Sequence, residues 1–404
     1  MTAFSTNSIH GGDHLKTTND VITPIHVTTT YSYSSNPDEL IPGGLTDPNT
    51  LVYSRENHPN AAQIEAIVES ITGYPTVVYN SGLSAFNALI THVNPKTLAI
   101  GDGYHGCQGI ADIWKRNFGL HQIHINDEEV APDGKSSKWD SVKQGDLVHL
   151  ETPLNPYGTY FDIRKYAKLA HDRGALLSVD ATFAPPPLLD PFKFGADIVM
   201  HSATKFFGGH SDLLAGLLLV KDQEVKKSLL LDRLVLGSNI ANLESALLVR
   251  SLRTFELRVA RQSKSAETIV KFLDLHKKDF PVLDVLHHGS LQQQNDEKEK
   301  EWITEQMPNG HTPVFSIELT SEDQAKLLPS KLKLFRHATS LGGAESLIEW
   351  RAMSDDHISK KLLRLSIGLE DPRDLLEDLV RGLLAVGGEK EADVLIEEIK
   401  SLKI

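Results

Sequence analysis

The segment from residue 178 to residue 216 constrains the fold more than any other part of the chain. It contains two apolar runs that end in polar residues: SVD ends in Asp180, and ADIVM continues into HSATK, which ends in Lys205. Short apolar runs of this kind predict buried strands. Because ligands of open α/β sheets bind beyond the carboxyl ends of the strands, we expect the polar residues after both runs to line a site.

The residue types at this sheet edge suit pyridoxal phosphate. A lysine amine can form a Schiff base, the hydroxyls of Ser202 and Thr204 can bind a phosphate, and the Asp180 carboxylate can keep a ring nitrogen protonated. Taken singly, each residue has an ordinary structural explanation, because most lysines are solvated and Asp, Ser and Thr often satisfy turns. The combination favours a site, since a buried run that ends in Lys205 needs a partner for the amine.

The same segment resembles the active-site lysine region of the Cys/Met metabolism PLP-dependent enzymes. Their pattern VD(N)TFxxP, GADxVxHSxTKxxxGHxD is matched almost throughout, and the resemblance runs from SIHGG at Ser8 to LRLSIGLEDP at Pro372. It implies an α/β chain with the PLP-dependent transferase fold type I, in which a large domain on a mainly parallel sheet precedes a smaller C-terminal α+β domain. It also implies pyridoxal 5'-phosphate as the cofactor, with Thr182 among the residues that bind it.

Composition argues against several other classes of protein. The chain has 41 Lys and Arg against 54 Asp and Glu, a formal charge of −13, and no basic block, so we expect neither nucleic acid nor a membrane as a partner. Cys107 is the single cysteine, which excludes an intrachain disulfide and a cysteine metal cluster, and we expect no metal. The N-terminal stretch has neither a basic nor an apolar leader, so the cytoplasm is the expected location.

Residues 1–60 show no sustained periodicity, and we interpret them as an N-terminal arm. Its VITPIHVTTTY stretch matches the family's PIxxTSTF, and its apolar residues need a surface to cover them. LVYSRENHPN matches YSRxxNPT, which implies that Tyr53 and Arg55 reach the cofactor phosphate of a neighbouring subunit; His58 and Asn60 depart from that pattern. The shared site predicts at least a homodimer, and the resemblance alone implies a tetramer.

Residues 61–255 are expected to form the large domain. Apolar spacing predicts a helix from about residue 60 to Gly73, followed by a TVVY strand and a turn at NSG. A glycine turn at a helix N-terminus presents backbone N–H groups to phosphate, so Gly82 and Leu83 are candidate cofactor ligands. Alternating strands and helices up to Asp180 predict a mainly parallel sheet with helices on both faces.

The loop GDGYHGC holds the clearest departure from the family pattern GDDxYGGT. Aligned on the flanking residues, His105 occupies the position of the aromatic residue that stacks on the cofactor, and Tyr104 takes that role if the loop shifts by one residue. An imidazole can also move protons, so His105 is a catalytic as well as a cofactor-binding candidate. TPLNPYG matches E(S/T)PxNP, so Asn155 is expected to bind the cofactor's phenolic oxygen, although an Asn-Pro turn is a common alternative.

Residues 256–404 are expected to form the small domain. SLGGAESLI matches the substrate-side SLGxxESLI and places Ser340 beside the substrate, while LRLSIGLE supplies Arg364 as the clamp for the substrate α-carboxylate. The family's HPAxMTH is replaced by EWRAMSDDH. Trp350 and Arg351 are therefore candidates for recognising a part of the substrate that ordinary sulfur substrates lack. The default alternative is that Arg351 is a surface residue.

The resemblance implies that Lys205 is displaced by an L-amino acid and then removes its α-proton. The HPN and GYHGCQ departures look like those of fungal cystathionine γ-synthase-like enzymes, some of which serve secondary metabolism. Our leading hypothesis is γ-replacement on O-acetyl-L-homoserine through a vinylglycine ketimine, with a second, nucleophilic substrate. That nucleophile is a β-keto acid such as acetoacetate, giving a cyclic imino acid of the pipecolate type, or a thiol, as in cystathionine γ-synthase and O-acetylhomoserine sulfhydrylase. A C–S lyase and a catalytically silent scaffold are the alternatives.

Overall fold

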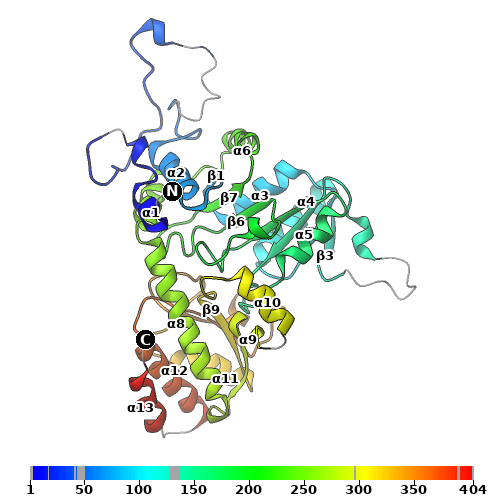
Figure 1. Ribbon diagram of the computed structural model, residues 1–404, viewed down its shortest axis with the longest axis vertical. Helices are drawn as coiled ribbons and strands as arrows, with labels where there is room; N and C mark the ends of the chain where they lie inside the picture. The colour runs from blue at the N-terminus through cyan, green and yellow to red at the C-terminus, as the bar shows by residue number, and fades with distance from the viewer. Residues whose placement is uncertain are drawn as a thin grey trace.

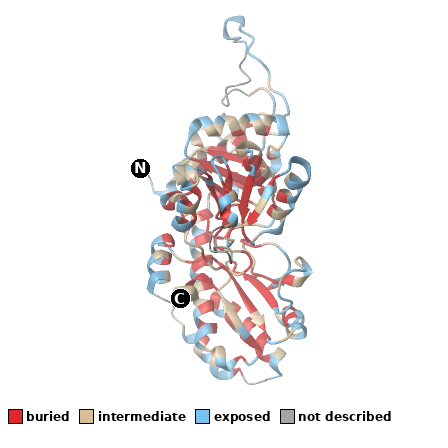
Figure 2. Ribbon diagram, turned by 90° about the vertical axis from the view of Figure 1, so that its right-hand side faces the viewer, coloured by how far each residue is buried: buried red, intermediate tan, exposed pale blue. Residues whose placement is uncertain are grey.

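Two sheets organise the chain, and apolar cores cover both faces of the larger sheet and one face of the smaller one (Figure 2). The computed structural model describes residues 3–16, 18–40, 42, 51–127, 137–294, 297–388 and 392–402. Within these ranges no helix combines the length and the apolar character that crossing a membrane requires.

The larger sheet has seven strands in the order β1-β7-β6-β5-β4-β2-β3. Strands β3, β2, β4, β5 and β6 run parallel, whereas β7 is antiparallel to both β6 and β1. All residues of β1, β2, β4, β6 and β7 are buried, as expected where helices cover both faces. The strands are β1 (Thr76–Tyr79), β2 (Thr97–Ile100), β3 (His121–His124), β4 (Leu147–Glu151), β5 (Leu176–Asp180), β6 (Ile198–His201) and β7 (Gly216–Val220). The mainly parallel sheet predicted from the sequence is confirmed.

Alternate strand residues point to opposite faces of this sheet and meet different helices. Val148 and Val179 pack in a core with α2, α5 and α7, while Leu147 and Met200 pack in another core with α3, α4 and α6. The helices before α8 are α1 (Phe4–His10), α2 (Pro59–Thr72), α3 (Gly82–Val93), α4 (His105–Phe118), α5 (Ile163–His171), α6 (Gln223–Leu236) and α7 (Asn242–Leu252).

The smaller sheet has five strands in the order β10-β11-β12-β9-β8, all antiparallel except the β10–β11 pair. One face is apolar, with Phe315, Ile348 and Leu363 packed against α8 and α12. The strands are β8 (Leu283–His287), β9 (Val314–Leu319), β10 (Arg336–His337), β11 (Leu347–Trp350) and β12 (Leu362–Ser366). The helices after α8 are α9 (Gly289–Gln292), α10 (Glu297–Gln306), α11 (Glu322–Leu327), α12 (Pro372–Gly387) and α13 (Asp393–Ser401).

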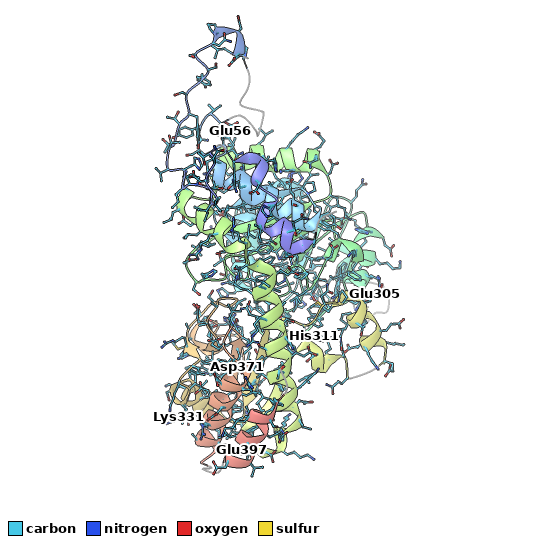
Figure 3. The ribbon with its side chains drawn as sticks, turned by 60° about the vertical axis from the view of Figure 1, so that its left-hand side comes forward. Glu56, Glu305, His311, Lys331, Asp371 and Glu397 are labelled. Atoms are coloured by element: carbon cyan, nitrogen blue, oxygen red, sulfur yellow. The ribbon has the colours of Figure 1, made fainter. Side chains whose placement is uncertain are left out.

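Helix α8 (Phe255–Leu275) connects the two sheets: it begins near α1 and runs past the smaller sheet (Figure 1). Its first turns place Phe255 in the core of the larger sheet, whereas Ile269 lies in the core of the smaller one. His311 lies beside this helix (Figure 3), and its carbonyl accepts a hydrogen bond of 2.6 Å from Ser263 Oγ. We therefore propose that the domain boundary expected after residue 255 lies inside α8.

The N-terminal arm leaves the body of the chain after α1 and the short 3-10 helix η1 (Asp13–Leu15) (Figure 1). Its apolar side chains are exposed in the single chain: Val21 by 83%, Ile22 by 52%, Ile25 by 52% and Val27 by 77%. Residues 43–50 of the arm lie outside the described residues. A covering surface from a neighbouring subunit stays a prediction.

Candidate active site

The carboxyl ends of β4, β5 and β6 meet at one edge of the larger sheet, as the sequence predicted. Glu151 ends β4 and pairs in register with Asp180 at the end of β5. Strand β6 ends at His201 and leads directly into Ser202 and Lys205. Lys205 lies four residues past the end of β6, in a turn where the Lys205 N–H donates to the Ser202 carbonyl.

The start of α3 carries hydrogen-bond donors that a phosphate can use. The helix begins at Gly82 after Ser81, whose side chain accepts from the Ser84 N–H. A Cβ added at Gly82 would lie 3.0 Å from Ser202 Cβ and 3.1 Å from Ser202 Oγ, so only glycine leaves room between the helix N-terminus and this hydroxyl. Free N–H groups of a first helical turn and a nearby hydroxyl are donors that an anion can use. Gly82, Leu83 and Ser202 therefore suit the role that the sequence suggested.

The hydroxyl of Thr204 is occupied in a different way. It donates to the Ala215 carbonyl at 3.3 Å and accepts from the Ala215 N–H at 3.0 Å, which ties the lysine turn to the residue before β7. A phosphate contact of Thr204 stays a prediction.

Asp180 is held by a chain of hydrogen bonds. Its Oδ1 accepts from the N–H and the hydroxyl of Thr182 at 2.9 and 2.6 Å, and Thr182 Oγ1 accepts from the Ser202 N–H at 2.8 Å. Burial raises the pKa of Asp180, while both Thr182 bonds lower it. The geometry thus connects Asp180, Thr182 and Ser202 in one network and suits Asp180 to face a protonated ring nitrogen.

Lys205 is a buried amine with a hydroxyl partner. Its Nζ lies 3.0 Å from Ser340 Oγ. Burial and the charge of Arg364 lower the pKa of Lys205 to about 8. Since an amine must lose its proton before it can attack a carbonyl carbon, this pKa favours a lysine that binds an aldehyde cofactor and later accepts a proton.

The small domain completes this side of the site. Ser340 has a left-handed backbone, with φ +75°, and its carbonyl accepts from Arg364 at 3.0 Å. Arg364 also donates to Asn155 Oδ1 at 3.0 Å. A Cβ at Gly342, φ +77°, would lie 2.8 Å from the backbone nitrogen of Phe206, so the 340–343 loop packs directly on the lysine turn. The structure therefore brings together Lys205, Ser340, Arg364 and Asn155, and their roles at the substrate and cofactor stay predictions.

Tyr104 and His105 both lie at the start of α4, beside the strand ends that carry the site. Their ring centroids are 4.9 Å apart and both side chains are exposed. The Tyr104 ring covers Gly106, where a Cβ would lie 2.6 Å from the ring and 2.8 Å from Leu83 Cδ2. Partial burial of the ring raises the pKa of the Tyr104 phenol; Cys107 and Glu151 add to the shift, and the charge of Arg351 opposes it. Tyr104 thus turns toward Leu83 and the strand ends, and we propose it ahead of His105 as the stacking residue.

Tyr53 and Arg55 are placed elsewhere in the chain. Arg55 donates to the Leu234 carbonyl at 2.8 Å, and its guanidinium lies 5.5 Å from the centre of the Tyr53 ring. Among the described residues, neither side chain makes a contact with the group around Lys205. Their role at the phosphate of a second subunit remains a prediction.

Glu151 is a site residue that the sequence analysis missed. Its carboxylate accepts from the Tyr104 N–H at 2.7 Å and from the Asn155 N–H at 2.9 Å. Burial and the charge of Asp180 raise the pKa of Glu151 to about 8. Glu151 thus connects the loop that holds Tyr104 to the loop that holds Asn155. The sequence feature that could have identified it is a carboxylate at the end of the buried strand LVHLE.

Glu349 is the second residue that was missed, and it changes the interpretation of Arg351. Its Oε2 accepts from Arg364 at 2.6 Å and from Arg351 at 2.9 Å, and its Oε1 accepts from Ser354 at 2.6 Å. Arg351 is only 4% exposed, so the default of a surface arginine is wrong. Trp350, by contrast, donates its indole N–H to the Lys360 carbonyl at 2.8 Å and takes no part in this cluster.

The comparisons with known proteins agree with this geometry. The family model described as Cys/Met metabolism PLP-dependent enzyme matches residues 5–384. The cystathionine gamma-synthase of Escherichia coli K12 is 32% identical over 381 residues, 90% of this chain and 93% of the relative. The cystathionine gamma-lyase of Saccharomyces cerevisiae is 32% identical over 398 residues, 94% of this chain and 97% of the relative.

Solved structures give the same result. The metB structure from Corynebacterium glutamicum has a TM-score of 0.83 at 30% identity, and the match covers 96% of this chain and 99% of that one. A cystathionine gamma synthase from Xanthomonas oryzae pv. oryzae, in complex with aminoacrylate and cysteine, has a TM-score of 0.82 at 27% identity, covering 96% and 100%. The predicted cofactor, pyridoxal phosphate, and the predicted fold type I are confirmed. The chain belongs to the Cys/Met metabolism PLP-dependent enzymes, the family that includes the cystathionine gamma-synthases and lyases.

Proposed function

We propose that the enzyme catalyses γ-replacement on O-acetyl-L-homoserine with a second substrate that carries a carboxylate. The preferred second substrate is a β-keto acid such as acetoacetate, which would lead to a cyclic imino acid of the pipecolate type in secondary metabolism. The observation that carries this proposal is Arg351, a second buried guanidinium beside the arginine expected to bind the α-carboxylate.

The position of Arg351 follows from strand pairing. Glu349 on β11 lies directly opposite Arg364 on β12, so both side chains leave the same face of the smaller sheet. Arg351 follows Glu349 by two residues, at the start of η8 (Arg351–Met353), and its guanidinium reaches the same Glu349 oxygen. Two cations therefore share one carboxylate on the face opposite the apolar core.

Arg351 also lies close to the large-domain loops that border the site. Burial raises the pKa of Tyr104 and of Tyr157, and the positive charge of Arg351 opposes the shift in both. Among the described residues, Arg351 Nε has no hydrogen-bond partner. Asp355 lies 3.7 Å from the Arg351 guanidinium, so two carboxylates balance the two arginines, and in this proposal the substrate carboxylate displaces Asp355 from Arg351.

In this proposal each residue has a defined task. Arg364 and Ser340 hold the α-carboxylate of the amino acid, and Lys205 removes the α-proton. Pyridoxal phosphate, when bound, supplies the electron sink that makes this proton and the next one acidic. Acetate leaves the γ-carbon with the C–O electron pair, and the deprotonated α-carbon of the keto acid forms the new C–C bond. The free amine of the product then condenses with the ketone and releases water, which closes the imine ring.

Product analysis tests the proposal. Holoenzyme with O-acetyl-L-homoserine and acetoacetate is expected to give a carbon-linked product by mass spectrometry. Cystathionine from L-cysteine alone would favour the second candidate, a cystathionine γ-synthase, which Arg351 also suits because cysteine carries a carboxylate. Ammonia released from cystathionine without a second substrate would identify a C–S lyase and contradict γ-replacement.

The Arg351→Met variant tests the second carboxylate site. Loss of a hydrogen bond to a charged group costs about 1.5–3 kcal/mol, so we expect KM for acetoacetate to rise about 10- to 100-fold. Acetylacetone, a carbon nucleophile without a carboxylate, is the matched control and should be used equally well by both proteins. An equal rise in KM for O-acetyl-L-homoserine would contradict the assignment, because it would mean that Arg351 only supports Arg364.

A further inference from the structure

We propose that Arg258 and Gln262, one helical turn apart on α8, are positioning residues: Arg258 holds the turn that carries Lys205, and Gln262 holds the loop that carries Ser340. Both act through backbone carbonyls of the site and not on the reacting atoms. The inference rests on Lys205 as the residue that binds the cofactor and moves the α-proton, and it does not depend on the second substrate.

Arg258 binds the backbone immediately after Lys205. Its Nη1 donates to the Phe206 carbonyl at 2.7 Å, and its Nη2 donates to the Phe207 carbonyl at 3.3 Å. The Lys205 carbonyl accepts from the Gly209 N–H at 2.7 Å, so all three carbonyls of this turn have donors. A Cβ at Gly209, φ +66°, would overlap Arg258 Nη1, so glycine is required for the guanidinium to reach the turn.

The burial of Arg258 is costly unless hydrogen bonds satisfy the guanidinium. The residue is only 4% exposed, and it also donates from Nη2 to the Ser251 carbonyl at 3.0 Å and from Nε to Thr254 Oγ1 at 3.3 Å. Burial and the charge of Arg250 lower the pKa of Arg258 to about 10, which leaves it a cation at neutral pH. Since its hydrogen-bond acceptors are neutral oxygens, the cation serves to fix the backbone and not to form an ion pair.

Gln262 holds the substrate side of the site in the same way. Its side chain is fully buried, and Nε2 donates to the Gly343 carbonyl at 2.8 Å and to the Ile367 carbonyl at 3.0 Å. Because both neighbours are carbonyl oxygens, the nitrogen and not the oxygen of the amide must face them. Gly343 lies three residues after Ser340, and Ile367 directly follows β12, the strand of Arg364. The amide thus fixes the loop and the strand expected to bind the α-carboxylate.

One helix face makes both attachments. Residues 258 and 262 lie four apart in α8, so their side chains leave the same face. The turn of Lys205 and the loop of Ser340 are therefore both held to one surface, where Lys205 Nζ lies 3.0 Å from Ser340 Oγ. A misplacement of about 1 Å can cost about 100-fold in rate, so this surface is expected to set the distance between the amine and the substrate.

Exchange of the α-proton tests the two roles separately. The holoenzyme is incubated with L-norleucine in D2O, and deuterium at the α-carbon is followed by NMR; norleucine has no leaving group, so no second substrate is needed. Arg258→Met should lower kcat for exchange about tenfold or more with KM little changed, because the amine is displaced while the carboxylate site stays. Gln262→Leu should raise KM about fivefold or more with a smaller effect on kcat, because the loop of Ser340 is released.

Three further variants serve as controls. Arg258→Lys keeps a cationic donor for one carbonyl and should recover part of the rate lost in Arg258→Met. Thr254→Val removes only the acceptor of Nε, so it should lower kcat by less. Arg173→Met is the matched control: Arg173 donates to the Trp139 and Leu169 carbonyls at 3.2 and 3.0 Å, before the start of β5 and at the opposite edge of the larger sheet from Lys205. Its loss should leave both constants unchanged.

The proposal is overturned if folded Arg258→Met and Thr254→Val proteins exchange the proton like the wild type, or if Gln262→Leu leaves KM unchanged. It is also overturned if the two helix variants lower kcat and raise KM alike, since that result indicates a general loss of packing. Exchange by Lys205→Met, or none by the wild-type holoenzyme, would remove its premise. The proposed γ-replacement can fail while all the expected exchange results hold, so the two proposals are tested independently.

Discussion

Lys205 shows how burial decides the chemistry of a single residue. Its amine has left water for a pocket that contains Ser340 and the positive charge of Arg364, and its pKa falls from 10.5 to about 8. The charged form is therefore the unfavourable one in the folded protein. In the cofactor-free protein, this burial lowers the free energy of unfolding at neutral pH, and the effect disappears over the pH range between the two pKa values.

We expect the cofactor-free protein to become more stable, relative to Lys205→Met, as pH rises from about 8 to 10.5. In this window the unfolded chain binds the lysine proton and the folded chain does not, so the free energy of unfolding rises with pH. Below pH 8 both states are protonated, and the methionine variant should be the more stable protein. Urea unfolding of both proteins across the window measures the difference, and parallel curves would show that the lysine is not buried as a cation.

At the scale of the element, the start of α3 and the hydrogen bonds that join α2, α6 and β1 support the site. Arg233 of α6 donates to Glu65 of α2 at 2.8 Å, to the Val78 carbonyl at 2.8 Å and to the Glu56 carbonyl at 3.0 Å. Glu65 in turn accepts from the Val78 N–H at 3.1 Å. This buried ion pair fixes three elements around the strand that leads into the phosphate turn.

Gly82→Ala should weaken cofactor binding. The added Cβ would press on Ser202 at 3.0 Å, and displacing one hydrogen-bond donor costs about 1 kcal/mol, or roughly fivefold in the cofactor dissociation constant. Gly109→Ala is the matched control, because Gly109 lies in α4 with open space around its Cβ position. It should leave cofactor affinity unchanged and stabilise the helix by about 0.5–1 kcal/mol. Equal affinities for both variants, measured by cofactor titration, would argue against phosphate binding at Gly82.

Arg233→Met should lower the free energy of unfolding by about 3 kcal/mol, because it leaves the buried Glu65 carboxylate with only Lys226, at 4.0 Å, as a cation. The double variant Glu65→Gln with Arg233→Met should lose less than the single variant, since the uncompensated charge is gone. Lys227→Ala, which breaks an exposed contact to Glu224, should change stability by less than about 1 kcal/mol. Denaturant unfolding distinguishes these cases, and a small loss in the single variant would mean that the pair is not buried in solution.

At the scale of the whole molecule, the site around Lys205 is open to completion by a second copy. Tyr53 is 45% exposed, and the apolar residues of the arm before it are exposed as well. Arg55 contacts Leu234 of α6 in its own chain, and the Tyr53 ring lies beside Arg55 and not beside Lys205. These observations support the prediction of an oligomer in which the arm of one subunit serves the site of another.

Mixing two inactive variants tests the shared site. If Arg55 serves the neighbouring subunit, a dimer of one Lys205→Met chain and one Arg55→Ala chain has one intact site. Random reassociation makes half of the dimers mixed, so we expect about a quarter of wild-type activity. Each variant alone provides the baseline, and subunits mixed without prior dissociation are the second control. No recovery after verified exchange would show that Arg55 acts within its own chain or not at the site.

The sequence by itself determined the alternating α/β architecture and the strand ends that hold Asp180 and Lys205. These features are local, because strand and helix periods, strand lengths and glycine turns depend only on residues that are close in the sequence. Only the tertiary structure decided the partners of the buried charges. Glu349 and Arg364 meet through the β11–β12 register, Arg351 of η8 reaches the same Glu349 carboxylate, and Glu151 meets Asp180 through the β4–β5 register. Burial and pKa depend on which distant strands pair, so the same arginine that looked like a surface residue in the sequence becomes part of the site.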